Sequence, residues 1–355
     1  MGRRAAVVAA AAVALVVLVV GGYVAWRALA PAGDYEAAMA TLPATTLRAT
    51  YTDWREVRAA ADGEGLDAGA GEGEVAAFLG RAFDRDLVST SAIGDSTVAM
   101  RDRYGVSPLD ASWEALGQSP SGQVVVLKVD EDVDLGGVEQ RLRSLGYEPP
   151  DGGIGTGGTW AGSPDLVAAL DPGLTPVFQN LAVLEDERLV VLSDRAEAVS
   201  ATVEVVRGDA PALDEPDLTA AAGEPVTAVL WGSDFACEDL AMASADEEDQ
   251  RVADQLVADA GGVSPLTGLV VAMQGDGSLR VALEFETDEQ ASANLQPRVD
   301  LAAGEAPGQG GSFADRFTVT NGEADGDTVL LELDPRGADF VFSDLTSGPV
   351  LFATC

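Results

Sequence analysis

The stretch GVSPL at residues 105–109 recurs unchanged at residues 262–266, and this repetition sets the expected plan of the chain. Before each copy, an apolar strand-like run leads to an Asp and an aromatic residue and then to a helical pattern: LRATYTDW at 47–54 and VTAVLWGSDF at 226–235. After each copy come a second apolar run, an acidic turn, a helical pattern and a glycine-rich loop. A preserved order of elements around a repeated motif indicates internal duplication. We therefore predict two tandem pseudo-repeats, at about 46–206 and 226–355.

Each pseudo-repeat has the coarse pattern β-α-α-β-β-α-β-β. Hairpin signals such as QGDGS at 274–278 and NGEADG at 321–326 separate short apolar runs. This order predicts an α+β fold in which each unit is an antiparallel sheet with helices on one face. We expect the first unit at 31–206, a Pro-rich and acidic linker at 207–225, and the second unit at 226–355.

The first 30 residues have the features of a membrane anchor. Arg3 and Arg4 precede an uncharged apolar run over residues 5–26. A helix of that length rises about 33 Å, which is enough to cross a bilayer. The Arg pair favours a cytoplasmic N-terminus, so residues 1–30 are predicted to be a cytoplasmic stub and transmembrane helix with an extracytoplasmic chain behind them. A cleaved signal peptide is the alternative, since ALA at 28–30 has the small-x-small form of a cleavage site.

Charge and histidine content exclude several classes of function. The chain has a formal net charge of −38 and no His, so nucleic acid and anionic lipid head groups would repel it. The absence of His removes Ser-His-Asp triads and His-based zinc sites. We therefore predict no nucleic-acid partner, no cofactor and no catalytic residues. The expected partners are the membrane, through the N-terminal helix, and an envelope protein or an apolar ligand.

The chain contains two cysteines, Cys237 and Cys355. In an exported protein an isolated pair of this kind is expected to form a disulfide, whereas a cytosolic location would keep both thiols reduced. We predict a Cys237–Cys355 disulfide.

Acidic residues are abundant, and most have a structural explanation. Asp130, Asp132 and Asp134 have the spacing of a calcium loop, but Leu135 and Arg141 occupy the positions that require Gly and Glu. Acids at strand-to-helix junctions are instead predicted to cap helices. This group contains Asp53, Asp194, Asp234 and Asp288. If the protein binds a metal ion, the first candidate ligands are Glu323, Asp325 and Asp327.

Four segments carry a resemblance to a known group of proteins: GVSPLDASWEALG at 105–117, GY at 146–147, DLVAAL at 165–170 and SDLTSGPVLFATC at 343–355. In these segments the chain resembles a group of uncharacterised membrane-anchored extracytoplasmic proteins of high-GC Gram-positive (actinobacterial) bacteria. The resemblance implies a location at the cell membrane. It implies no catalytic or binding residues.

The anchor, the duplication and the lack of nucleophile–base sets together predict a non-catalytic binding or interaction module at the cell envelope. A duplicated unit often leaves a groove between its halves where a ligand can lie. Two alternatives stay open: a carrier or sensor of an apolar envelope ligand, and a carboxylate-dependent hydrolase.

Overall fold

The computed structural model describes residues 33–337 and 340–355. The predicted membrane anchor lies outside these residues. Within them, no helix combines the length and the apolar character needed to cross a bilayer. Residues Asp34–Cys355 pack together as one compact unit.

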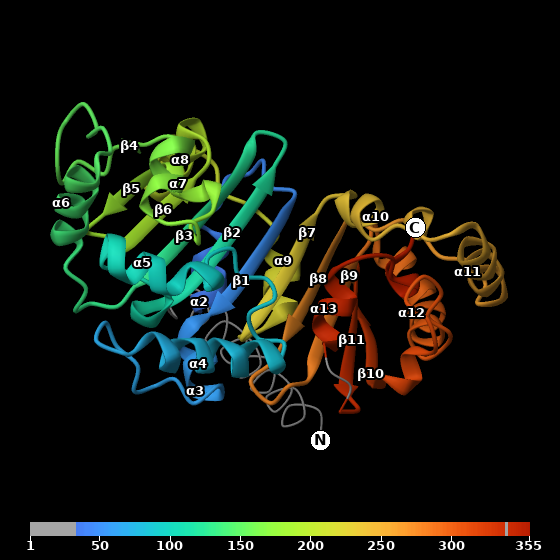
Figure 1. The fold of residues 1–355 in the computed structure, drawn as a ribbon. Coiled ribbons are helices and arrows are strands. Elements are labelled where there is room, and N and C mark those ends of the chain that lie inside the picture. Colours follow the sequence, from blue (N-terminus) through green and yellow to red (C-terminus); the bar gives the residue numbers. More distant parts are fainter. Residues whose placement is uncertain (1–32, 338–339) are drawn as a thin grey trace, which may run out of the picture. The chain divides into compact units, whose positions relative to one another are not determined.

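The described residues form one 11-stranded sheet (Figure 1), in which neighbouring strands run antiparallel. Its spatial order is β10-β11-β9-β8-β7-β1-β2-β3-β6-β5-β4. The strands are β1 (Arg48–Asp53), β2 (Ala111–Ser119), β3 (Gly122–Val129), β4 (Trp160–Ala161), β5 (Asn180–Leu184), β6 (Leu189–Ser193), β7 (Thr227–Gly232), β8 (Gly268–Met273), β9 (Leu279–Glu284), β10 (Phe317–Asp325) and β11 (Thr328–Pro335). The predicted α+β class with antiparallel pairing is confirmed.

Apart from the two-residue edge strand β4, the strand order is the same on either side of the sheet centre. From β1 outward the order is β1-β2-β3-β6-β5, and from β7 outward it is β7-β8-β9-β11-β10. β1 and β7 pair with each other, with Thr50 opposite Val229. The two sets of strands therefore make one continuous sheet in place of two separate ones.

Helices cover both faces of this sheet. They are α2 (Asp34–Met39), α3 (Trp54–Ala60), α4 (Glu72–Asp84), α5 (Thr97–Tyr104), α6 (Leu135–Leu145), α7 (Pro164–Leu170), α8 (Ala196–Val206), α9 (Pro216–Ala222), α10 (Phe235–Asp239), α11 (Glu247–Asp259), α12 (Asp288–Ala302) and α13 (Val341–Thr346). Short 3-10 turns lie at Gly94–Ser96, Pro108–Asp110, Pro176–Gln179, Met242–Ser244, Phe313–Asp315 and Leu351–Ala353. Side chains of α2, α8 and α9 join one buried cluster, and those of most other helices join a second.

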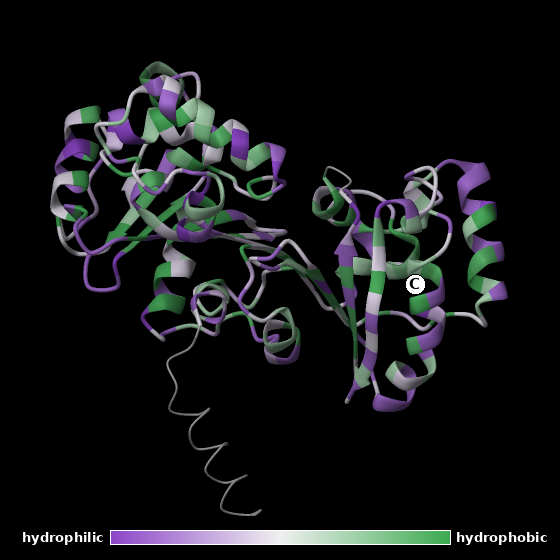
Figure 2. Ribbon diagram, turned by 90° about the horizontal axis from the view of Figure 1, so that it is seen from below, coloured by the Kyte–Doolittle hydropathy of each residue, from purple (hydrophilic) through white to green (hydrophobic). Residues whose placement is uncertain are grey.

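The prediction of helices on one face of each sheet is therefore wrong. The reason is visible in the strands, because β5, β6, β7 and β8 are buried at every position. A sheet covered on one side alternates apolar and polar residues, whereas continuous apolar runs indicate cover on both sides. In Figure 2 several strands are mainly green, whereas the helices mix green and purple residues.

Two of the acidic junctions cap helices as predicted. Asp53 accepts the backbone N–H groups of Arg55 and Glu56 at the start of α3, and Asp134 accepts that of Gly137 in α6. Elsewhere the cap is a neighbouring residue or has no side-chain bond. The N-cap of α8 is Arg195, that of α12 is Thr287, and Asp234 precedes α10 without a capping bond.

Candidate functional site

A pocket of about 750 Å³ opens where β1 and β2 meet elements of the C-terminal half. One wall comes from the start of β1 and the end of β2, and the other from α10 and the segment after α13. Its lining residues are Leu47, Arg48, Gln118, Ser119, Pro120, Phe235, Glu238, Asp239, Thr346, Ser347 and Gly348. The volume is that of a site for a small organic molecule.

Arg48 is the cation in this wall. As the first residue of β1 it stands between Gln118 of β2 and Trp231 of β7 in the sheet register. Its Nη1 donates to Gln118 Oε1 at 2.8 Å, and its guanidinium carbon lies 5.5 Å from the centroid of the Trp231 ring. Its Nε lies 3.6 Å from Asp239 Oδ2. Burial lowers the pKa of Arg48, and the charge of Asp239 opposes that shift.

Asp239 is held from a second side, because the indole Nε1 of Trp231 donates to its Oδ2 at 2.6 Å. Trp231 is fully buried in the sheet. One tryptophan therefore fixes both members of the Arg48–Asp239 pair, through its ring face and through its N–H. The Arg48 guanidinium and the Asp239 carboxylate are therefore held in fixed orientations in the pocket wall.

The wall formed by α10 is tied to the C-terminus. A disulfide joins Cys237 of α10 to Cys355, with 5.5 Å between the Cα atoms, which confirms the predicted bridge. The fully buried Arg298 of α12 donates to the carbonyl oxygens of Phe352 and Thr354 at 2.9 and 2.6 Å. Burial lowers the pKa of Arg298 to about 9. Covalent and polar contacts thus hold the segment that supports α10.

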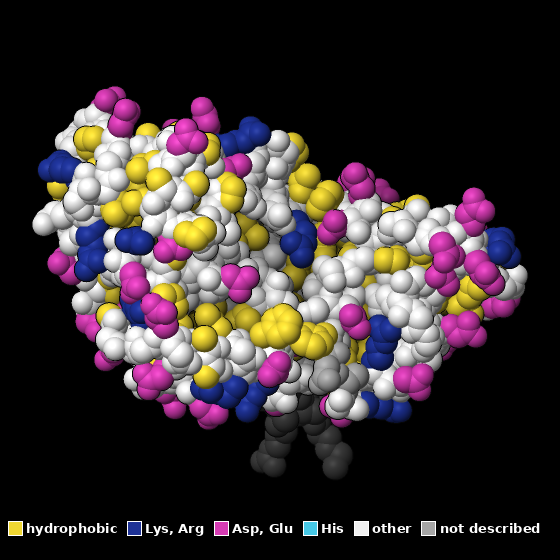
Figure 3. Space-filling view, viewed as in Figure 1, with side chains coloured by type: hydrophobic (Ala, Val, Ile, Leu, Met, Phe, Trp, Pro, Cys, Tyr) yellow, Lys and Arg dark blue, Asp and Glu magenta, His cyan; other side chains and the backbone are white. Residues whose placement is uncertain are grey.

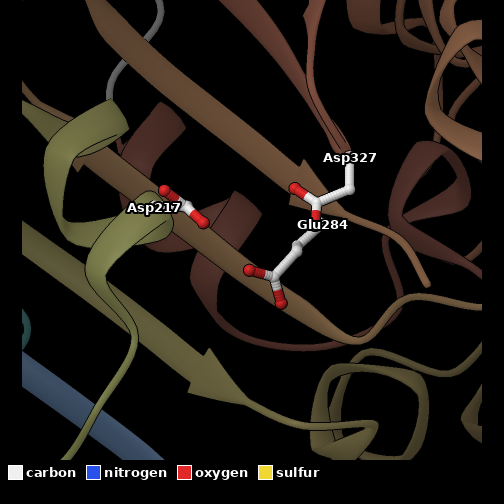
Figure 4. Close-up of side chains that lie close together, drawn as sticks. All are labelled: Asp217, Glu284 and Asp327. Atoms are coloured by element: carbon white, nitrogen blue, oxygen red, sulfur yellow. The ribbon is translucent and has the colours of Figure 1, made fainter. Parts of the chain in front are cut away.

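A second group of charged residues lies away from the pocket lining. The carboxylate oxygens of Asp217, Glu284 and Asp327 lie within 4.8 Å of one another. Figure 4 shows these side chains converging from α9, the end of β9 and the β10–β11 turn. Thr267 Oγ1 donates to Glu284 Oε2 at 3.0 Å. Carboxylates are the ligands that hard cations such as Ca²⁺ prefer.

Electrostatics in this group favour the protonated form of Glu284. Burial is the main cause that raises the pKa of Glu284, and the charges of Asp327 and Asp217 add to it. The neighbouring Glu215 has its pKa raised to about 7, first by burial and then by the charge of Glu284.

The structure separates the three metal-ligand candidates named from the sequence. Asp327 belongs to the group with Asp217 and Glu284. Glu323 and Asp325 lie on the exposed strand β10 and are not part of that group. Their role as metal ligands stays a prediction. Asp217 was hidden from sequence reasoning because it lies in the assumed linker, and Glu284 because it ends a strand.

Acidic side chains elsewhere are dispersed. Figure 3 shows Asp and Glu spread over the visible face, with Lys and Arg between them. On this face the acidic charge is therefore spread out and is not gathered into one patch.

No protein-family model and no curated protein sequence matches the chain. Among solved structures, it is similar to "Structure of crystal form IV of TP0453" with a TM-score of 0.40 and 10% identity, covering 89% of this chain and 100% of the other. "Structure of crystal form III of TP0453" gives a TM-score of 0.38 and 8% identity, covering 86% and 95%. A likeness of this degree carries no information about function.

Proposed function

We propose that the chain is a non-catalytic extracytoplasmic binding module, held at the cell membrane by residues 1–30, that binds a small ligand in the pocket beside Arg48. The observation that carries the proposal is the pocket itself. It has the volume of a ligand site, about 750 Å³, and an oriented charge pair stands in its wall. Concave sites with a few fixed polar groups among apolar ones are typical of small-molecule binding.

We propose further that the compact unit arose by duplication, with related halves at about 46–206 and 226–355. The shared strand orders β1-β2-β3-β6-β5 and β7-β8-β9-β11-β10 support this origin. So does the GVSPL stretch, which precedes β2 and β8 in the two halves. On this account the pocket lies where the halves join. Residues 207–225, assigned to the linker, contain α9, which packs on the second half.

An extracytoplasmic location is part of the proposal. The Cys237–Cys355 disulfide supports it, because such bonds persist in oxidising compartments. An envelope protein remains the alternative partner if no small molecule binds.

The two other functions weighed from the sequence fit the pocket less well. A carrier of a wholly apolar molecule would leave Arg48 and Gln118 facing a ligand that offers them no acceptor. A carboxylate-dependent hydrolase needs two acids that are not engaged elsewhere. The lining holds Glu238 and Asp239, and Asp239 accepts the Trp231 N–H at 2.6 Å and faces Arg48.

The test is native mass spectrometry of the full chain, produced in an actinobacterial host and purified in lipid nanodiscs, because detergent would compete for the pocket. Ser347→Trp places a large side chain in the pocket lining, and Ser144→Trp, at an exposed site on α6, is the matched control. We expect a bound mass on the wild type and on Ser144→Trp, and none on Ser347→Trp. A bound mass retained by Ser347→Trp, or a bare protein in all three, contradicts the proposal.

A further inference from the structure

We infer that the pocket takes a ligand with a single oxyanion, a carboxylate or sulfonate, attached to an apolar body, and that Arg48 receives the oxyanion. This inference rests on the proposed function, since it assumes that the pocket is a binding site. It adds the chemical class of the ligand and the residue that recognises it.

Arg48 has hydrogen-bonding capacity that the protein does not use. A guanidinium carries five N–H donors and cannot accept. Here it makes one good bond, to Gln118 Oε1 at 2.8 Å, and one at the distance limit, 3.5 Å, to the carbonyl oxygen of Thr346. Its Nε has no hydrogen-bond partner within the described residues. The Arg48 side chain is 22% exposed.

The Arg48 guanidinium is held in place before a ligand arrives. The guanidinium stacks on Trp231 and is fixed by Gln118 and Asp239, so it loses little freedom when a ligand binds. Arg presents its donors in a rigid fork that matches the two oxygens of a carboxylate. Asp239 faces Nε, whereas Nη1 and Nη2 each donate one N–H and keep a second N–H that no acceptor among the described residues takes. An oxyanion approaching from the pocket meets these donors.

Apolar side chains line the part of the pocket next to Arg48. Leu47, Pro120 and Phe235 line the same pocket, where Leu47 and Phe235 are half-buried and Pro120 is exposed. Covering such side chains removes apolar surface from water, which stabilises a complex. A ligand with an oxyanion and an apolar body would therefore contact both the Arg48 donors and the apolar side chains.

Charge limits the ligand to one negative group. Asp239 already offsets part of the Arg48 charge, and Glu238 stands exposed in the same lining. The chain as a whole carries −38. A phosphate monoester or a polyanion would meet this field with two or more charges, whereas a singly charged carboxylate or sulfonate meets it with one.

The experiment compares two fluorescent probes that share an aromatic skeleton and differ in charge. 1-Anilinonaphthalene-8-sulfonate carries one sulfonate, and N-phenyl-1-naphthylamine is neutral. Both are titrated into the full chain in nanodiscs, for the wild type, Arg48→Met, Ser347→Trp and the control Arg251→Met, which removes an exposed Arg of α11. Protein-free nanodiscs supply the background signal.

We expect Arg48→Met to weaken binding of the sulfonate probe about tenfold or more, because a charge-assisted hydrogen bond is lost. Binding of the neutral probe should change less than about twofold by the same comparison. Arg251→Met should leave both probes unchanged, and Ser347→Trp should remove both. Equal loss of the two probes on Arg48→Met overturns the inference and leaves the proposed function standing. Wild-type binding of neither probe overturns both.

A measurement on the wild type covers the case in which Arg48→Met does not fold. Decanoate and decanol, matched in chain length, compete for bound N-phenyl-1-naphthylamine below the concentration at which either aggregates. We expect decanoate to displace the probe at a concentration about tenfold lower than decanol does. Equal potency, or stronger displacement by decanol, contradicts the role of Arg48.

Discussion

Among single residues, the acids of the Glu215–Glu284 pair give the structure a pH dependence. The pKa of Glu215 is about 7 in the folded chain, against an ordinary value of 4.5. The folded chain therefore holds a proton that the unfolded chain releases between about pH 4.5 and 7. Through this window the free energy of unfolding falls as pH rises, because the folded state binds more protons.

We expect Glu215→Gln to remove this loss of unfolding free energy at high pH, because Gln has no proton to release. The variant should equal the wild type near pH 4 and be more stable by about 1 kcal/mol near pH 8, a value reduced for the partial exposure of the side chain. Urea unfolding at both pH values measures the difference. Glu64→Gln, in an exposed loop, is the control. A variant less stable than the wild type at pH 8 would show that the ionised carboxylate is stabilising.

At the level of elements, α13 depends on a residue from the other half of the chain. Its N-cap, Phe340, has φ 62° and makes no side-chain capping bond. The carboxylate of Asp86, which is 4% exposed, instead accepts the backbone N–H of Ser343 at 2.8 Å and also the Ser343 hydroxyl. Asp86 itself has φ 59°, a conformation that Asp and Asn tolerate better than other side chains.

Asp86→Ala should therefore cost about 2 kcal/mol of unfolding free energy, from the lost cap and the strained backbone together. Asp86→Asn keeps an acceptor and tolerates the same φ, so we expect it to cost less than about 1 kcal/mol. Denaturant unfolding of both variants gives the values. Equal losses in the two would mean that neither the cap nor the backbone conformation decides the stability of α13.

The Cys237–Cys355 bridge couples α10 to the C-terminal residue across a separation of 118 residues. Replacing both cysteines by Ser should lower the free energy of unfolding by roughly 2–5 kcal/mol. It should also weaken binding of 1-anilinonaphthalene-8-sulfonate, because α10 supplies Phe235 and Asp239 to the pocket. A reductant should reproduce both effects on the wild type and change nothing in the double variant. Unchanged stability after reduction would show that Arg298 alone secures the segment.

Local signals predicted the elements better than their assembly. Apolar runs and hairpin turns indicated most strands and the antiparallel α+β class. The pairing of β1 with β7 joins residues 175 to 183 positions apart, such as Thr50 with Val229, which are 179 apart, and nothing local specifies it. The helix α9 was missed because its seven residues, PDLTAAA, lie in a Pro-rich and acidic stretch that favours a linker.

For the whole molecule, the candidate site could not be predicted from the sequence, because it too depends on contacts between residues far apart in the chain. Its lining comes from segments near residues 47, 118, 235 and 347, which only the sheet and the disulfide bring together. Of the links that bring these segments together, the sequence predicted one, the Cys237–Cys355 disulfide. Asp327 was named as a metal-ligand candidate, but its neighbours Asp217 and Glu284 come from elements whose packing no motif encodes.

The central claim is that the pocket beside Arg48 is where the chain binds its ligand. Hydrogen–deuterium exchange of the full chain in nanodiscs, with and without 1-anilinonaphthalene-8-sulfonate, tests it most directly. We expect slower exchange confined to peptides covering residues 47–48, 118–120, 235–239 and 346–348, which carry the lining. Protection elsewhere with none at these four segments would contradict the account.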